Sequence, residues 1–206
     1  MSRPLDAQDV AKYLVAHTDW EAGETISNLK LLKLVYYAQG FCVAMRGEPL
    51  FSETVQAWAN GPVVREVYDA YKHNAYLAIP APVGFDPDAY LPEDRELLDA
   101  VLSTYGQLSA TRLRDLTHEE RPWQEANGTL RQNEPISVSS MHEFFKPLVE
   151  AGRRGESAAG RPAWPTLSLV FQQRRRSSER MEPHRTRLRK IASGRSPADD
   201  PWEDDD

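Results

Sequence analysis

Apolar side chains in the first 150 residues recur at steps of three and four positions, which is the spacing of an amphipathic helix. The strongest such segment follows Ser27, a residue type that is favoured just before the first turn of a helix. It runs to about Met45 and is apolar enough to predict a helix in the centre of the core. Weaker patterns predict helices over residues 6–18, from Gly61-Pro62 to about Tyr71, from Pro92 to about Tyr105, and after Ser109, Pro122 and Ser139 or Ser140.

Two short segments suggest β-structure. Residues 54–59 alternate apolar and polar side chains, which fits a short strand or a last helical turn. Ile136 and Val138 fit a second brief strand. Gly61-Pro62 is expected to open a helix, because proline at the first helical position loses no hydrogen bond. The fold class expected for residues 1–150 is therefore mainly α: one compact domain of about six helices with a small β-element.

The last quarter of the chain has a different composition. Residues 151–162 form a linker rich in Gly, Ala and Arg, and residues 164–171 are a short apolar island. The island can be a linear motif, a strand added to a partner, or a helix that docks on the body. Residues 174–195 hold 9 basic and 2 acidic side chains, and the chain ends in an acidic run. With so few core-forming residues, the segment 151–206 is expected to be a disordered linker and tail.

The formal charge of −6 is unevenly distributed. Residues 151–206 hold 12 basic and 9 acidic side chains, which leaves 13 basic and 22 acidic ones in residues 1–150. The body therefore carries a net charge of −9, whereas the tail carries +3. An acidic body is a poor general binder of nucleic acid and suits a basic protein partner.

The sequence lacks a cysteine pair, a signal peptide and a membrane-spanning run, and these features bear on the expected cellular compartment. Cys42 is the only cysteine, so no disulfide and no thiolate metal site can form within one chain, and its apolar neighbours indicate an inert buried thiol. The first residues have no apolar core of the kind found in signal peptides. No run approaches the 18 apolar residues of a membrane span. A soluble, cytoplasmic protein is expected.

Residues 118–120, His-Glu-Glu, resemble catalytic chemistry more than any other segment does. They lack the second histidine of the zinc-binding HExxH motif, and adjacent helical residues such as His118 and Glu119 do not face each other. A helix-end histidine, hydrogen-bonded to the backbone beside a packed Trp123, fits better. Nucleophile-elbow, P-loop and dinucleotide-binding motifs are all absent. The sequence therefore predicts no enzyme, no metal and no cofactor.

Aromatic and basic residues around Gly61-Pro62 form the candidate binding surface. Trp58 before this turn is either a packing anchor or a binding hot spot, and Arg65 and Tyr68 follow on the predicted helix. Lys33 interrupts the apolar central helix. It either reaches solvent at the edge of the apolar stripe or pairs within a polar seam, with Glu66, Asp69 or a partner's carboxylate.

Three sequence blocks carry a resemblance to a known family. The first is residues 27–40, SNLKLLKLVYYAQG. The second is residues 48–51, EPLF, followed by residues 57–68, AWANGPVVREVY. The third is residues 116–123, LTHEERPW. From about Val10 to Lys146 the body resembles the Panacea-domain antitoxins, also described as SocA-like or phage-associated GepA-like proteins.

The resemblance implies an antitoxin that binds and neutralises a cognate protein toxin encoded beside it. Members of at least one branch are thought to hand their toxin to an ATP-dependent protease. Residues 151–206 lie outside the resemblance, and no family role is carried onto them. On this interpretation the partner-binding residues are expected to be Lys33, Trp58, Arg65, Tyr68, His118 and Trp123.

A nucleic-acid-binding transcriptional regulator is the alternative interpretation. It rests on phosphate contacts by the basic tail and on predicted helices between Ser109 and Ala126 that can imitate a helix-turn-helix. The net charge of −9 on the body argues against it.

Overall fold

The computed structural model describes residues 5–18, 25–74, 76–128, 132–157 and 161–165. At the centre lies helix α2 (Asn28–Arg46), whose side chains from Lys30 to Val43 are all buried. The Ser27 side chain accepts a hydrogen bond from the Lys30 backbone at its start, and Gly47, with a left-handed backbone, ends it. The helix predicted after Ser27 is confirmed, together with its central position.

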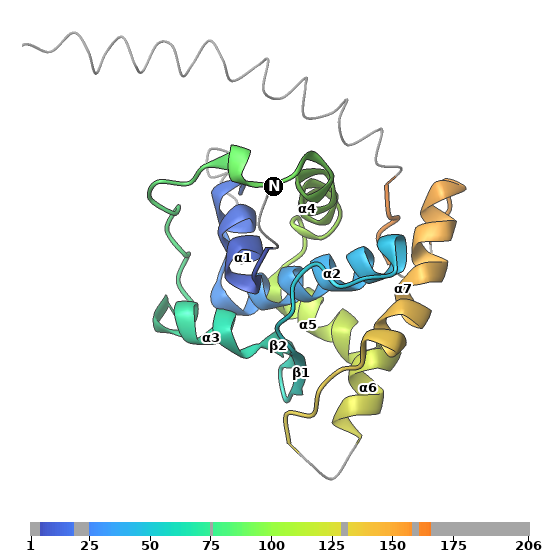
Figure 1. Ribbon diagram of the computed structural model, residues 1–206. Coiled ribbons are helices and arrows are strands. Elements are labelled where there is room, and N and C mark those ends of the chain that lie inside the picture. Colours follow the sequence, from blue (N-terminus) through green and yellow to red (C-terminus); the bar gives the residue numbers. More distant parts are fainter. Residues whose placement is uncertain (1–4, 19–24, 75, 129–131, 158–160, 166–206) are drawn as a thin grey trace, which may run out of the picture. The chain divides into compact units, whose positions relative to one another are not determined.

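Other helices pack around and beside α2 (Figure 1). Helix α2 contacts α1, α4, α5 and α7, and it packs most extensively against α7. Pro147 lies inside α7. The mainly α fold predicted from the sequence is confirmed. The helices are α1 (Ala7–Ala16), α3 (Arg65–Tyr71), α4 (Pro92–Tyr105), α5 (Ala110–His118), α6 (Arg121–Asn127) and α7 (Val138–Arg153), with single 3₁₀ turns at Lys72–Asn74 and Pro87–Ala89.

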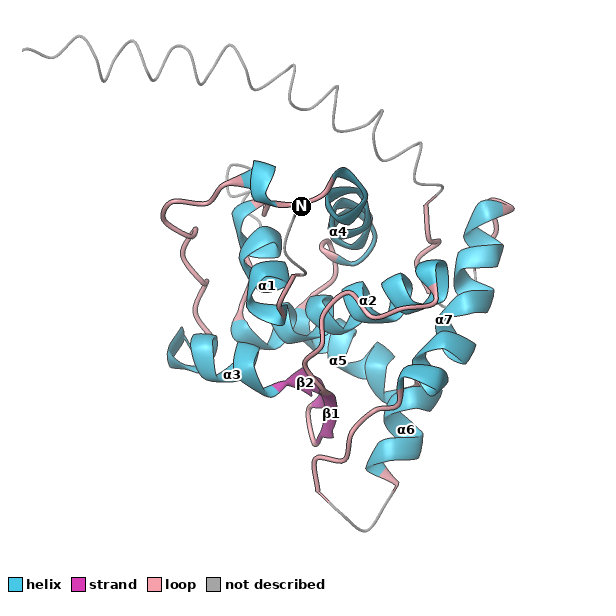
Figure 2. Cartoon of the chain, viewed as in Figure 1, coloured by secondary structure: helices cyan, strands magenta, loops and turns pink. Residues whose placement is uncertain are grey.

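The small β-element is a two-stranded antiparallel hairpin (Figure 2). Strand β1 (Val55–Trp58) pairs with β2 (Gly61–Val64), and Trp58 lies opposite Gly61. The strand interpretation of residues 54–59 is thus confirmed. The helix predicted to end near Tyr71 is present, but its predicted start at Gly61 was wrong, since α3 begins at Arg65. Gly61 has φ +95°, outside the helical region, and β2 is buried at all four residues. Pairing with β1 satisfies its backbone and overrides the helix-start signal of the proline.

The predicted strand at Ile136 and Val138 was also wrong. Ile136 donates a backbone hydrogen bond to Val55 and Glu134 accepts one from Ala57, which together make only an isolated bridge to β1. Val138 already begins α7, whose N-cap is Ser137 and not Ser139 or Ser140. The segment before α7 therefore runs briefly along the hairpin and then turns into the helix.

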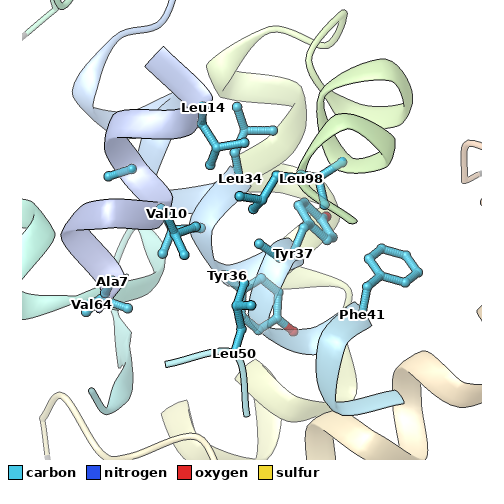
Figure 3. Packing of buried hydrophobic residues seen from close by; sticks show 14 of the residues in the cluster. Ala7, Val10, Leu14, Leu34, Tyr36, Tyr37, Phe41, Leu50, Val64 and Leu98 are labelled. Carbon is cyan, nitrogen blue, oxygen red and sulfur yellow. The ribbon is translucent and has the colours of Figure 1, made fainter. Parts of the chain in front are cut away.

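The core gathers side chains from α1, α2, α4 and the hairpin region (Figure 3). Leu14 of α1, Leu34 of α2 and Leu98 of α4 all belong to this core. Gly40 lies so close to the Phe145 ring that a Cβ there would collide with it, so the Phe145 side chain of α7 packs directly against the backbone of α2. Burial raises the pKa of the Cys42 thiol to about 11, as expected for an inert buried thiol. Among the described residues no helix combines the length and the apolar character needed to span a membrane.

Candidate functional site

The three sequence blocks of the resemblance meet around a set of buried polar side chains. Block one contributes residues of α2, block two the turn of the hairpin, and block three the junction between α5 and α6. A further residue, Arg161, reaches the same place from beyond α7. We call this set the polar cluster: Lys33, Tyr36, Tyr37, Glu120 and Arg161.

Glu120 is the centre of the polar cluster and has no exposed surface. Its carboxylate accepts hydrogen bonds from the Tyr36 hydroxyl at 2.7 Å and the Tyr37 hydroxyl at 2.9 Å. It also accepts one from the Arg161 guanidinium at 2.5 Å. Burial raises the pKa of Glu120, while Arg161 and both hydroxyls act against that rise. Burial, and then the Glu120 charge, keep the pKa of both tyrosines well above the ordinary value, so their hydroxyls remain donors.

Lys33 is fully buried, and the charge of this carboxylate acts on it. Its Nζ donates a hydrogen bond of 2.9 Å to the Pro62 carbonyl, which ties α2 to the hairpin. The lysine therefore neither reaches solvent nor pairs with Asp69, whose carboxylate binds Arg65 and Lys72 instead. Burial lowers the pKa of Lys33 to about 7, and the charge of Glu120 opposes this change.

Gly61 lets the hairpin turn approach the polar cluster. A Cβ at this position would lie 2.7 Å from the Thr117 hydroxyl and 2.9 Å from the Lys33 Nζ. The positive φ angle also disfavours any other residue. The glycine therefore serves both the turn and the close contact between the blocks.

Above the polar cluster, aromatic and basic side chains form a partly exposed surface. The Trp58 and Tyr68 rings pack with centroids 5.0 Å apart, and the Arg65 guanidinium lies 5.8 Å from the centre of the Trp58 ring. Arg65 is exposed, whereas Trp58 and Tyr68 are half-buried. A cation over an indole face keeps both groups in place and leaves their outer sides available to a partner.

His118 and Trp123 extend this surface along α5 and α6. The two rings stack with centroids 4.1 Å apart, and the indole nitrogen of Trp123 donates a hydrogen bond of 3.0 Å to the Trp58 carbonyl. Within the described part of the chain, the buried Nε2 of His118 has no hydrogen-bond partner, unlike the backbone-bonded histidine expected from the sequence. Burial, and then the Lys33 charge, lower the pKa of His118.

Five of the six residues predicted to bind a partner are thus linked by direct contacts. We call these five the Trp58 face: Trp58, Arg65, Tyr68, His118 and Trp123. Lys33 lies beneath it and supports the hairpin. Sequence reasoning missed the cluster role of Glu120, because a glutamate in a HEER segment gives no sign of burial. It also missed Arg161, which lies in the stretch expected to be a linker.

A second feature missed from the sequence is an exposed apolar loop after α3. Tyr76 is 94% exposed, and Leu77 and Val83 are also largely exposed. The prolines at positions 80, 82 and 87 are typical of a surface loop, but they do not indicate that its large apolar side chains point outward. Exposed large apolar side chains that follow one another in the chain are more typical of interaction surfaces than isolated ones are.

The described residues contain no set of three or more His, Cys, Asp and Glu side chains arranged to hold a metal ion. The basic run of residues 174–195 and the acidic end of the chain lie outside the described residues, so the nucleic-acid interpretation stays a prediction.

Comparison with known proteins supports the resemblance carried by the three sequence blocks. Residues 31–124 match the family described as "Antitoxin SocA-like, Panacea domain". The chain is 35% identical over 109 residues to "Antitoxin SocA" of Caulobacter vibrioides (strain NA1000 / CB15N), and this match covers 48% of the chain and 58% of that protein. No solved structure matches the chain. All three sequence blocks fall wholly or mostly within the matched residues, so the part of the chain that builds the hairpin and most of the polar cluster is similar to the SocA-like Panacea domain.

Proposed function

We propose that this protein is an antitoxin: a cytoplasmic, non-enzymatic binding protein that neutralises a toxic protein encoded beside it. The observation that carries the proposal is the Trp58 face, a partly exposed aromatic and basic surface built from the blocks of an antitoxin family. Similarity to Antitoxin SocA supports the same role.

The Trp58 face has the chemistry of a protein-binding hot spot. Tryptophan, tyrosine and arginine are the residue types that contribute most to protein interfaces. The Lys33 hydrogen bond to the Pro62 carbonyl holds the hairpin in place beneath it, and the Trp123 hydrogen bond to the Trp58 carbonyl holds α6 against the hairpin. A surface that is already ordered loses less conformational entropy on binding.

Charge supports a basic partner. The net charge of −9 on residues 1–150 would draw a positively charged toxin toward the body and raise the rate of association. Proteins that act on nucleic acid commonly carry positive charge, which fits a toxin that attacks RNA or translation. Delivery of the bound toxin to an ATP-dependent protease would be a further step, which the family resemblance suggests.

Co-expression with the neighbouring gene product tests the proposal. That product should arrest growth alone, and growth should return when this chain is co-expressed. A Trp58→Ala variant should fail to restore growth, whereas Arg154→Ala, which removes an exposed arginine at the end of α7, should still restore it. A neighbouring product that is harmless alone, or that still arrests growth beside the intact chain, would show that the antitoxin assignment is wrong.

A further inference from the structure

Residues 161–165 pack against the helices although they follow the linker-like stretch after α7. Arg161 and Trp164 are 10% and 4% exposed, respectively. Both lie outside the family match of residues 31–124, whereas much of the surface that receives them lies inside it. The receiving surface, which we call the C-terminal groove, is formed by Phe41, Leu116, Glu120, Phe144 and Gly152.

The Arg161 end of the C-terminal groove is a receptor for a guanidinium group. One nitrogen donates to the buried Glu120 carboxylate, and a second donates to the Leu116 carbonyl at 3.4 Å. The Phe144 ring lies 5.1 Å from the guanidinium carbon and covers it. A fixed carboxylate, a carbonyl and an aromatic face select the planar, multiply donating arginine side chain over lysine.

The Trp164 end is a slot for an indole. The Trp164 and Phe41 rings stack with centroids 3.5 Å apart and nearly parallel planes. Gly152 of α7 lies directly under the Trp164 carbonyl, and a Cβ on Gly152 would collide with that oxygen. Because position 152 carries no side chain, the backbone of residues 161–165 can pass close to α7.

We propose that the C-terminal groove is a peptide-binding site for an arginine followed three positions later by a tryptophan, and that residues 161–164 are its resident ligand. A partner protein with an extended segment of this chemistry would compete for the same site. The receptor is built on helices, and the ligand is a short segment joined to α7 by a short connection, so the two are separable in principle. The proposal does not depend on the antitoxin assignment.

The covalent connection determines how strong a competitor must be. A short tether gives an attached ligand an effective concentration on the order of millimolar. A free peptide with micromolar affinity for the empty groove would then bind the intact chain about 100- to 1000-fold more weakly. The affinity of a free peptide should therefore differ measurably between a chain whose C-terminal groove is occupied and one whose groove is empty.

A labelled synthetic peptide spanning residues 157–168 provides the test. Fluorescence anisotropy should detect its binding to the full-length Arg161→Ala/Trp164→Ala variant at least about 100-fold more tightly than to the unaltered chain. Peptides with alanine in place of the arginine or of the tryptophan should bind weakly to both proteins. Equal binding to both proteins, or no binding to a folded double variant, would overturn the proposal.

Two further variants separate groove binding from general folding effects. Adding Gly152→Ala to the double variant fills the space under the Trp164 carbonyl, so peptide binding should be lost. Unchanged binding in this triple variant would place the peptide elsewhere and refute the proposed site. If the double variant is unfolded by circular dichroism, the peptide should restore its helical signal, and a failure to do so would show that residues 161–164 are a fixed part of the fold.

Discussion

The indole nitrogen of Trp123 donates a hydrogen bond to the backbone carbonyl of Trp58, which joins α6 to the β-hairpin. Phenylalanine at position 123 would keep an aromatic ring against His118 but remove this donor. We expect Trp123→Phe to lower the free energy of unfolding by about 1 kcal/mol, the typical net contribution of one such bond. Urea unfolding of the two proteins measures this, and equal stability would mean that the bond contributes nothing.

Gly61→Ala should destabilise the fold more than an alanine at another glycine with positive φ. At Gly61 the added methyl group collides with the Thr117 hydroxyl and the Lys33 side chain, whereas at Gly84 it would meet open space. Left-handed strain alone costs about 1–2 kcal/mol and applies to both variants. Thermal melts should therefore show a clearly larger loss for Gly61→Ala, and equal losses would contradict the tight packing described for the turn.

The free energy of unfolding should rise between pH 7 and pH 9 because of the titration of Lys33. Its pKa is lowered from 10.5 to about 7 in the fold, so the unfolded chain binds more protons than the folded chain between these values. The cost of the buried charge is fully present below pH 7 and is relieved as the pH rises toward 10.5. The free energy of unfolding should gain at most about 1.4 kcal/mol per pH unit from this group.

Lys33→Met is the matched variant for that experiment, because it keeps an unbranched side chain only one atom shorter and removes the charge. The difference in unfolding free energy between the intact chain and Lys33→Met isolates the lysine from the other titrating groups. It should change in favour of the intact chain between pH 7 and 9. A difference that stays constant over this range would mean that Lys33 does not titrate there.

Arg161→Ala should destabilise the protein, because it leaves the Glu120 carboxylate buried without its guanidinium partner. Breaking a buried ion pair on one side typically costs about 3–5 kcal/mol. Arg121→Ala is the control, since the ion pair of Arg121 with Glu125 is exposed and its loss should change stability very little. Chemical denaturation of both variants measures their free energies of unfolding. Similar losses of stability in the two variants would contradict this prediction.

Substitutions on the Trp58 face should weaken binding of the purified neighbouring gene product. We expect Trp58→Ala to raise the dissociation constant by about 30-fold, which corresponds to the 2 kcal/mol of a hot-spot residue. Arg65→Ala should also weaken binding, since Arg65 is exposed and packs over the same ring. Arg154→Ala should bind as the intact chain does, and titration calorimetry distinguishes these cases.

The sequence predicted most of the helices because their apolar periodicity is local information. Ser27 and Ser109 cap helices as expected, and Pro92 opens α4. The β2 strand was not predicted, because Gly61-Pro62 is also a good helix start and only pairing with β1 decides between the two. The residues near Gly61 do not by themselves reveal that another strand pairs with them.

The candidate site was predicted only in its outer part. The Trp58 face could be inferred because tryptophan, tyrosine and arginine are typical of binding surfaces. The burial of Lys33 and Glu120 could not, because each becomes acceptable only through hydrogen bonds to residues far away in the chain. Arg161 could not be connected with Glu120 from a stretch that reads as a linker.

The close approach of Gly40 to Phe145 limits where this chain can be cut to make chimeras with other proteins. The segment shared with the family ends at residue 124, yet α7 lies beyond it and covers the α2 face around Phe41 and Gly40. A chimera that joins residues 1–128 of this chain to another protein's C-terminal half would need a helix with an aromatic ring at the position of Phe145. Without one, the chimera should expose that face and aggregate, which size-exclusion chromatography would reveal. The unit that recombination can move intact is therefore larger than the unit that similarity detects.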